Sequence, residues 1–403
     1  MNFIEQFLNN AEKRGLYTEI FSIKKSPTSP EIKIGQKTFI SFSSNNYLGL
    51  ANNNKVKKAV IEGVKIYGMG SGGSRLLSGN TKVQEDLETS IATFKGCQSS
   101  ITFATGYMAN VGAIPALMNN PYNKYFPKYL SGGINKSTIF SDELNHASII
   151  DGCRLSKSKI VVYKHLDVED LEKKVRKYGK RNSLIVTDGI FSMDGDIAPL
   201  DKIVNIGKKY NVKIMVDDAH ASGVLGNKGK GTLEYFNIEE KEVDAVMGTF
   251  TKAFGGVGGF IAGNAKLIKY LRIAARTYIF TAPIAPPIAM GLLESIKIAS
   301  GEEGLRDKLW NNADYLRNKL TDIGFKILGQ THILPIFIGE EEKAITFSKK
   351  LFQKGIYAPS VRWPAVKKGS ARLRVTVTSS HVKNQLDRLI EACSQIGEEL
   401  KIL

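Results

Sequence analysis

The sequence predicts an α/β fold: a large domain on a mainly parallel, seven-stranded sheet sandwiched by helices, and a smaller C-terminal α+β domain. Stretches with apolar residues at helical spacing, such as 168–178 and 200–210, alternate with apolar runs of strand length. This alternation is typical of a parallel sheet between two layers of helices. The strand-length runs are 100–104, 138–141, 159–163, 183–187, 213–217, 245–249 and 259–262.

The sequence pattern that predicts alternating strands and helices changes after a proline-rich stretch at 283–287. We therefore expect residues 1–44 to form a helix and an arm, 45–290 the large domain, and 291–403 the small domain. A helix at 288–300 leads into the small domain, which contains a strand at 372–378 and an amphipathic helix at 382–400. The segment 119–133 has three Tyr, two Pro and no periodicity, and it is predicted to be a surface loop, or else a lid or interface element.

Composition excludes several classes of protein. The chain has 403 residues, 42% hydrophobic and 24% charged, which is typical of a globular protein with a large core. Three cysteines are too few for a disulfide scaffold, and the five histidines form no H-x-x-x-H pair, so no metal site is expected. No signal peptide or transmembrane segment is evident, and we expect a cytoplasmic protein.

The formal net charge of +17 leaves two interpretations open. The lysines could simply solvate helix faces, or they could attract an anionic partner such as coenzyme A, an acidic carrier protein or lipid headgroups. Because the basic residues are scattered and form no stripe with aromatic residues, a nucleic-acid partner is not expected.

Four features stand at the ends of predicted strands, where open α/β sheets place their ligands. Asp217 ends a buried strand, and a buried carboxylate needs a cation. Lys252 follows another strand and precedes a glycine-rich turn, where it could form a Schiff base. His146 offers a planar ring, and the turn at Gly106 opens a helix whose free amides suit a phosphate.

Each of these features alone is weak, because a strand-end Asp is usually a helix cap and a lone Lys is usually solvated. Together they fit pyridoxal phosphate (PLP). The lysine binds the cofactor covalently, the Asp keeps the pyridine nitrogen protonated, and the helix N-terminus holds the phosphate.

The chain resembles the α-oxoamine synthases, a family within the aspartate-aminotransferase-like (type I) PLP enzymes, from about residue 15 to about residue 396. The resemblance rests on seven motifs that occur in order. They are Phe42-Ser-Ser-Asn-Asn-Tyr-Leu-Gly-Leu50, Gly70-Ser-Gly-Gly-Ser-Arg-Leu-Leu-Ser-Gly79, Asn145-His-Ala-Ser148, Ile190-Phe-Ser-Met-Asp-Gly-Asp196, Asp217-Asp-Ala-His220, Gly248-Thr-Phe-Thr-Lys252 and Arg372-Leu-Arg374.

The resemblance implies a role for each matching residue. Lys252 is the Schiff-base lysine, Asp217 is the partner of the ring nitrogen, and His146 stacks on the ring. The implied contacts to the cofactor's phenolic oxygen and nearby substrate are His220 and Ser192. The implied phosphate contacts are Gly106, Tyr107 and Thr249, with Thr281 reaching the phosphate from the neighbouring subunit. The implied contacts to the amino-acid carboxylate are Asn45 and Arg374, with Arg372 on the same strand face as an open alternative.

The implied activity is a decarboxylative condensation of a small amino acid with an acyl thioester, giving an aminoketone, CO₂ and a free thiol. The enzyme would be a homodimer with a shared active site, and the acyl donor would be either acyl-CoA or an acyl carrier protein. Aminotransferase activity and a non-catalytic PLP-fold protein are the alternatives from other classes, although a silent subunit would normally lack Lys252.

Two branches of the family are similar to different parts of the chain. Residues 357–367 resemble the 8-amino-7-oxononanoate synthases, which join alanine to a pimeloyl thioester in biotin biosynthesis, and this branch is preferred. Residues 15–21, 105–110 and 255–260 resemble the serine palmitoyltransferases of sphingolipid biosynthesis. Glycine-using relatives such as glycine C-acetyltransferase remain a third alternative.

Overall fold

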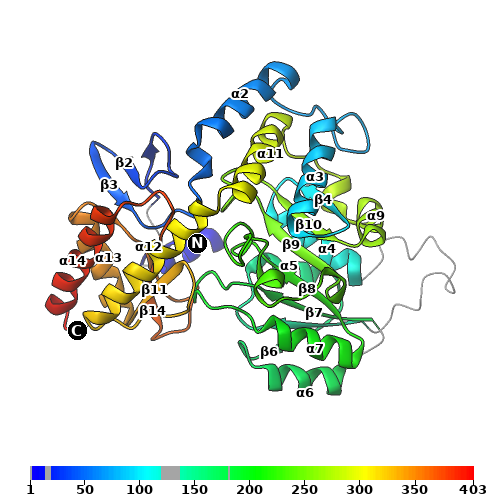
Figure 1. Ribbon diagram of the computed structural model, residues 1–403. Helices are drawn as coiled ribbons and strands as arrows, with labels where there is room; N and C mark the ends of the chain where they lie inside the picture. The colour runs from blue at the N-terminus through cyan, green and yellow to red at the C-terminus, as the bar shows by residue number, and fades with distance from the viewer. Residues whose placement is uncertain (1, 14–19, 119–136, 180–181) are drawn as a thin grey trace.

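The computed structural model describes residues 2–13, 20–118, 137–179 and 182–403, and a seven-stranded sheet lies at its centre (Figure 1). The order of its strands is β4-β10-β9-β8-β7-β5-β6. Only β10 runs antiparallel to its neighbours in this sheet, so the predicted mainly parallel sheet is confirmed. The strands are β4 (Ser99–Phe103), β5 (Ser137–Asp142), β6 (Lys159–Tyr163), β7 (Asn182–Asp188), β8 (Lys213–Asp217), β9 (Ala245–Thr249) and β10 (Gly259–Gly263).

Helices cover both faces of this sheet because successive strand residues point to opposite sides. In β8, Met215 packs in the same apolar cluster as residues of α4 and α5, whereas Ile214 and Val216 pack with α6 and α7. The helices on the first face are α4 (Gly106–Met118), α5 (Ala147–Leu155), α9 (Ala265–Ala274) and α10 (Arg276–Ile279). Those on the second face are α6 (Val168–Tyr178), α7 (Leu200–Tyr210) and the short α8 (Thr232–Tyr235).

A third group of helices lies beside the β4 edge of the sheet. α2 (Asn54–Tyr67) and α3 (Lys82–Lys95) pack on α11 (Pro286–Gly301). Two prolines begin α11, at positions where a missing N–H leaves no helical hydrogen bond unmade. The prediction of a helix after the proline-rich stretch is therefore confirmed.

The C-terminal part forms a smaller unit on the left of Figure 1. Its sheet contains β11 (Ile333–Gly339), β14 (Ala371–Thr376) and β13 (Ser360–Val361), in that order. The helices α12 (Glu303–Asp322) and α13 (Glu341–Gln353) pack on it, and α14 (Lys383–Glu399) packs on these two helices. The predicted strand at 372–378 and the predicted terminal helix are both present.

The N-terminal part holds more regular structure than the helix and arm expected from the sequence. After α1 (Phe3–Lys13) come β1 (Ile23–Lys24), β2 (Glu31–Ile34) and β3 (Lys37–Ser41). β3 also pairs in parallel with β12 (Ile356–Tyr357), which belongs to the C-terminal unit. The division at residues 44 and 290 stays a prediction, and the predicted loop at 119–133 lies outside the described residues. No helix in the described part of the chain is long and apolar enough to cross a bilayer.

Candidate active site

A buried carboxylate marks the end of β8. The side chain of Asp217 accepts hydrogen bonds from the Asn110 amide at 2.7 Å and from the Ala219 N–H at 2.9 Å. The residue is 3% exposed, and no described residue forms an ion pair with it. An anion buried in this way is expected to face a cation, which is the role of a protonated pyridine nitrogen. This observation fits PLP.

Lys252 lies in the turn after β9, and its electrostatic surroundings favour reactivity. Burial lowers the pKa of its amine to about 8, although the charges of Asp217 and Asp188 act in the opposite direction. An amine with this pKa is partly neutral near physiological pH and can attack a carbonyl group. The following turn is tightly packed, because a Cβ atom on Gly255, whose φ is +70°, would lie 2.2 Å from the Ala51 nitrogen.

A second buried carboxylate, which sequence analysis missed, stands beside the first. Asp188 ends β7 directly opposite Asp217 in the parallel register and is 5% exposed. Burial, followed by the neighbouring charge of Asp217, raises the pKa of Asp188 well above its ordinary value. Its strand-end position is the same signal that identified Asp217, so the sequence did contain the information needed to find it.

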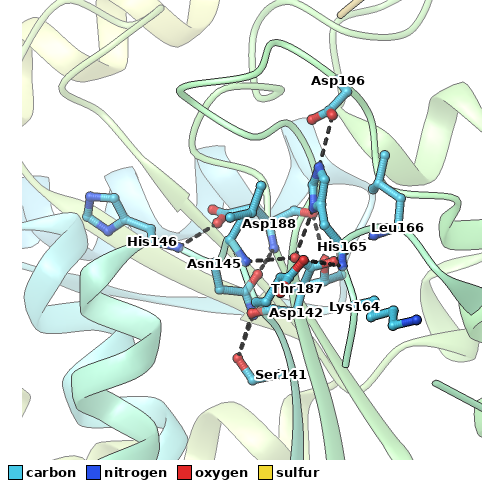
Figure 2. Close-up of polar contacts among 12 residues, drawn as sticks. Ser141, Asp142, Asn145, His146, Lys164, His165, Leu166, Thr187, Asp188 and Asp196 are labelled. Carbon is cyan, nitrogen blue, oxygen red and sulfur yellow. Dashed lines mark hydrogen bonds and ion pairs between the residues drawn. The ribbon is translucent and has the colours of Figure 1, made fainter. Parts of the chain in front are cut away.

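His146 is held in place by the end of β7 (Figure 2). Its backbone N–H donates to the Asp188 carboxylate at 2.7 Å, and its Nδ1 lies 2.8 Å from the Ser148 hydroxyl. The side-chain amide of Asn145 donates to the Val186 carbonyl at 2.9 Å and ties this loop to the same strand. Desolvation lowers the pKa of the His146 imidazole, so the ring is suited to stacking as a neutral group.

His220 is buried and hydrogen-bonded through one ring nitrogen. Its Nδ1 lies 2.7 Å from the hydroxyl of Tyr47, which also lies 3.0 Å from Oδ1 of Asn45. Burial, then the charges of Lys252 and Arg374, lower the pKa of His220 well below its ordinary value. The opposite ring nitrogen remains available for the cofactor's phenolic oxygen. Tyr47 lies in a family motif, but sequence analysis assigned it no role.

The start of α4 offers free backbone donors. In the described part of the chain, the N–H groups of Gly106 and Tyr107 have no hydrogen-bond partner, whereas the N–H of Met108 donates to Thr105. A Cβ atom on Gly106 would lie 3.1 Å from the Thr249 hydroxyl oxygen, so this turn and the end of β9 are adjacent. The arrangement fits a phosphate. The Tyr107 hydroxyl donates a hydrogen bond to Asp151, so the backbone N–H of Tyr107 is the group that could contact the phosphate.

The two candidate arginines on β14 have different surroundings. Arg372 is 5% exposed and forms an ion pair with Asp194. The Nε–H of Arg374 donates to the Ser192 carbonyl oxygen at 2.6 Å, and its terminal nitrogens lie 3.3 and 3.4 Å from Oδ1 of Asn45. Because Arg374 has only neutral oxygen partners among the described residues, its charge remains available for a substrate carboxylate.

Thr281 stands apart from the other predicted site residues. Its hydroxyl donates to the Ala282 carbonyl at 3.4 Å, and no described contact joins it to Lys252 or Gly106. The described residues also contain no group of three or more His, Cys, Asp or Glu side chains that could hold a metal ion.

Residues 37–393 match the family model described as Aminotransferase class I and II. The chain belongs to this family. Among curated relatives, it is 45% identical over 394 residues to an 8-amino-7-oxononanoate synthase from Lysinibacillus sphaericus, with 97% of each sequence covered. It is 42% identical to the protein of the same name from Thermoanaerobacter pseudethanolicus, covering 100% of this chain and 98% of the relative.

Solved structures agree with this class I and II aminotransferase assignment. A serine palmitoyltransferase variant from S. paucimobilis with a bound PLP–myriocin aldimine superposes with a TM-score of 0.91 at 30% identity, covering 100% of both chains. An 8-amino-7-oxononanoate synthase from Francisella tularensis gives 0.75 at 29% identity, covering 91% of this chain and 99% of the other. The fold is that of the type I PLP-dependent transferases, and the cofactor is PLP.

Proposed function

We propose that this protein catalyses the reaction of the 8-amino-7-oxononanoate synthases, the condensation of alanine with a pimeloyl thioester to give the aminoketone, CO₂ and free thiol. The full-length similarity to curated relatives of that name supports the substrate pair. The observation that carries the chemistry is the buried amine of Lys252, whose pKa is lowered by burial and which interacts electrostatically with the buried carboxylate of Asp217.

The described residues would each serve one part of this reaction. Bound PLP supplies an aldehyde for covalent attachment and a ring that withdraws electrons from the α-carbon of the amino acid. The carboxylate of Asp217 would keep a proton on the ring nitrogen. The amine of Lys252 would hold the cofactor until the amino acid displaces it, and the freed amine would then accept the α-proton. His146 would cover one face of the ring and exclude water from it.

The carboxylate of the amino acid would lie between Arg374 and Asn45. The guanidinium of Arg374 is already oriented by the Ser192 carbonyl oxygen and by Oδ1 of Asn45, so little side-chain freedom is lost when the carboxylate binds. Arg374 holds the carboxylate until it leaves as CO₂. A bidentate guanidinium contact also fixes the orientation of the α-carbon bonds.

We further propose a homodimer in which Thr281 contributes to the partner's phosphate site. A single chain leaves several large apolar side chains of α2, of the loop after it and of the residue before Thr281 exposed, among them Ile61, Met69, Leu77 and Phe280 at 58, 91, 85 and 69%. Exposed apolar surface of this kind marks an interaction site. A second copy of the chain would cover it.

The experiment that tests the proposal is a matrix of amino acids against acyl thioesters. The purified protein with PLP is mixed with alanine, serine or glycine, and with pimeloyl or palmitoyl thioesters of coenzyme A and of a carrier protein. Thiol release and CO₂ release are measured. We expect both products with alanine and a pimeloyl thioester, and their absence with that pair would reject the proposal.

Serine palmitoyltransferase activity is the second candidate. The observation that favours it is the TM-score of 0.91 to that enzyme, compared with 0.75 to the Francisella synthase. In the same matrix this activity would release thiol with serine and a palmitoyl thioester. Aminotransferase activity would convert amino acids to oxo acids without releasing thiol, so the three outcomes are distinct.

A further inference from the structure

One histidine outside the proposed active site lies between two carboxylates (Figure 2). Nδ1 of His165 is 2.9 Å from Oδ1 of Asp142, and its Nε2 is 2.9 Å from Oδ2 of Asp196. An ionised carboxylate only accepts hydrogen bonds, so both ring nitrogens must carry protons. The geometry therefore identifies His165 as an imidazolium.

The electrostatic surroundings agree with this charge. Burial by itself lowers the pKa of His165, but hydrogen bonds to Asp142 and Asp196 and the charges of both outweigh it and raise the pKa from 6.5 to about 10. The backbone N–H of His165 also donates to Glu143 at 3.2 Å, and Glu143 is itself paired with Lys367. On the preceding residue, the backbone N–H of Lys164 donates to Asp170, which pairs with Lys174.

The pKa of His165 is raised overall, whereas desolvation leaves the pKa of each of the other four histidines below its ordinary value. They are His146, His220, His332 and His381.

The imidazolium holds both arms of a short hairpin at residues 190–197. Ile190 and Ile197 form an antiparallel bridge, and the N–H of Phe191 donates to the Asp196 carbonyl oxygen at 3.1 Å. His165 binds the second arm through the Asp196 carboxylate. It contacts the first arm through Phe191, whose ring lies 4.5 Å from the imidazole ring at an angle of 87°.

This hairpin supports the arginine proposed to bind the amino acid. Ser192, which directly follows Phe191, accepts the Nε–H of Arg374 at 2.6 Å. Asp142, the other carboxylate that holds His165, accepts a hydrogen bond from the Leu144 N–H at 2.9 Å. Leu144 lies two residues before His146, the residue proposed to stack on the cofactor. His165 therefore lies between the loops that carry His146 and Ser192.

We propose that His165 is a positioning residue for the amino-acid substrate. Its imidazolium, held between Asp142 and Asp196, fixes the 190–197 hairpin so that the carbonyl oxygen of Ser192 orients Arg374. The inference rests on the proposed function in that the Arg374 guanidinium binds the substrate carboxylate. It does not depend on which amino acid is used.

The first test observes the charge directly. The PLP-bound enzyme is labelled with ¹⁵N-histidine, and the ring nitrogens are observed by NMR at about pH 8, above the ordinary pKa of histidine. We expect one ring among the five histidines with both nitrogens protonated, and we expect it to disappear in His165→Gln. A spectrum with no imidazolium at this pH, or one that the substitution leaves in place, would overturn the proposal.

The second test separates positioning from general stability. In His165→Gln a neutral amide replaces the imidazolium, so we expect the KM for the amino acid to rise roughly fivefold, as for removal of one member of a coupled network. The KM for the thioester should stay unchanged. Asp196→Asn keeps a hydrogen-bond acceptor for Nε2 of His165 but removes the negative charge. It should raise the KM for the amino acid by less than His165→Gln does. This second variant keeps the proposal testable if His165→Gln fails to fold.

The control variant is Lys350→Gln, which removes an exposed ion pair with Glu399 and should leave both KM values unchanged. Equal amino-acid KM values in the wild type, His165→Gln and Asp196→Asn would overturn the proposal. Measurements use whichever amino acid the wild type accepts. A wild type that accepts serine in place of alanine would therefore contradict the proposed function while the His165 comparison still decides the inference.

Discussion

Burial sets the charge of the individual side chains at this site. It lowers the pKa of Lys252 and of His220, and it raises the pKa of Asp188. The amine thereby becomes a nucleophile and the imidazole stays neutral. These charges support our proposal that Asp217 would face the protonated ring nitrogen of PLP.

Replacing the nucleophilic amine tests the covalent link to the cofactor. We expect Lys252→Ala to abolish thiol release, because no other described side chain offers an amine beside Asp217. Borohydride treatment of the wild type should attach the cofactor to Lys252. Lys266→Ala, which changes an exposed lysine on α9, should behave like the wild type. Normal turnover in Lys252→Ala would contradict the assignment.

Replacement by lysine should have different effects at the two arginines of β14. Arg374→Lys loses the bidentate contact and should raise the KM for the amino acid by roughly tenfold. Arg372→Lys weakens a buried ion pair with Asp194 and should mainly lower the melting temperature. Steady-state kinetics and thermal unfolding of both variants make the comparison. The reverse pattern would assign the substrate to Arg372.

Sequence reasoning singled out Asp217 and Lys252 as site residues but not Asp188 or Tyr47. Asp217 and Lys252 are recognisable because each follows an apolar run that ends in the sheet. Asp188 also ends a strand and could have been found in the same way, but its place opposite Asp217 and the contact of Tyr47 with His220 join distant parts of the chain. Only tertiary structure brings such pairs together.

Whole elements were predictable where their periodicity was strong. Six strands of the central sheet are buried on both faces and read as continuous apolar runs, whereas the edge strand β6 exposes Ile160 and Val162. The pairing of β2 with β3 was missed because its outer positions carry residues such as Glu31, Lys33 and Lys37, which dilute the apolar pattern. The start of α4 was found because a helix N-terminus beside a strand end is a phosphate-binding arrangement.

The helix start gives a prediction about cofactor affinity. A methyl group at Gly106 would lie 3.0 Å from the end of the Met247 side chain and 3.1 Å from the Thr249 hydroxyl, so in Gly106→Ala these side chains or the first turn of α4 must shift by a few tenths of an ångström. We expect PLP to bind more weakly by roughly tenfold, measured by titration of the apoenzyme. Gly304→Ala is the control, since a Cβ atom there would meet nothing within 4 Å. Equal affinities would show that this turn does not hold the phosphate.

The 190–197 hairpin gives a prediction about stability and pH. The folded pKa of His165 is raised from 6.5 to about 10, so its stabilisation is complete below the unfolded value and is lost as the pH rises through the folded value. The difference in unfolding free energy between the wild type and His165→Gln should therefore shrink steadily from about pH 6.5 to about pH 10. Denaturant unfolding across this range measures it. A difference that does not vary with pH would show that His165 carries no charge in the fold.

If Thr281 serves the partner's site, a single chain lacks one residue of its own phosphate site and the dimer is the functional unit. Thr281→Val removes its hydroxyl and should weaken PLP binding. Mixing this variant with Lys252→Ala should then restore turnover, because a mixed dimer has one site with both Lys252 and a partner's hydroxyl. Activity after subunit exchange measures this. No recovery from subunits shown to have exchanged would place Thr281 outside the partner's site.

The parallel pairing of β3 with β12 has a consequence for biosynthesis. Ile40 leaves the ribosome early, whereas its partner Ile356 emerges only when the chain is almost complete. Until then one edge of the N-terminal strands stays open, and an open edge can recruit a strand from another chain. Nascent or truncated chains that end before residue 356 should therefore be prone to aggregation, even when the central sheet has already folded.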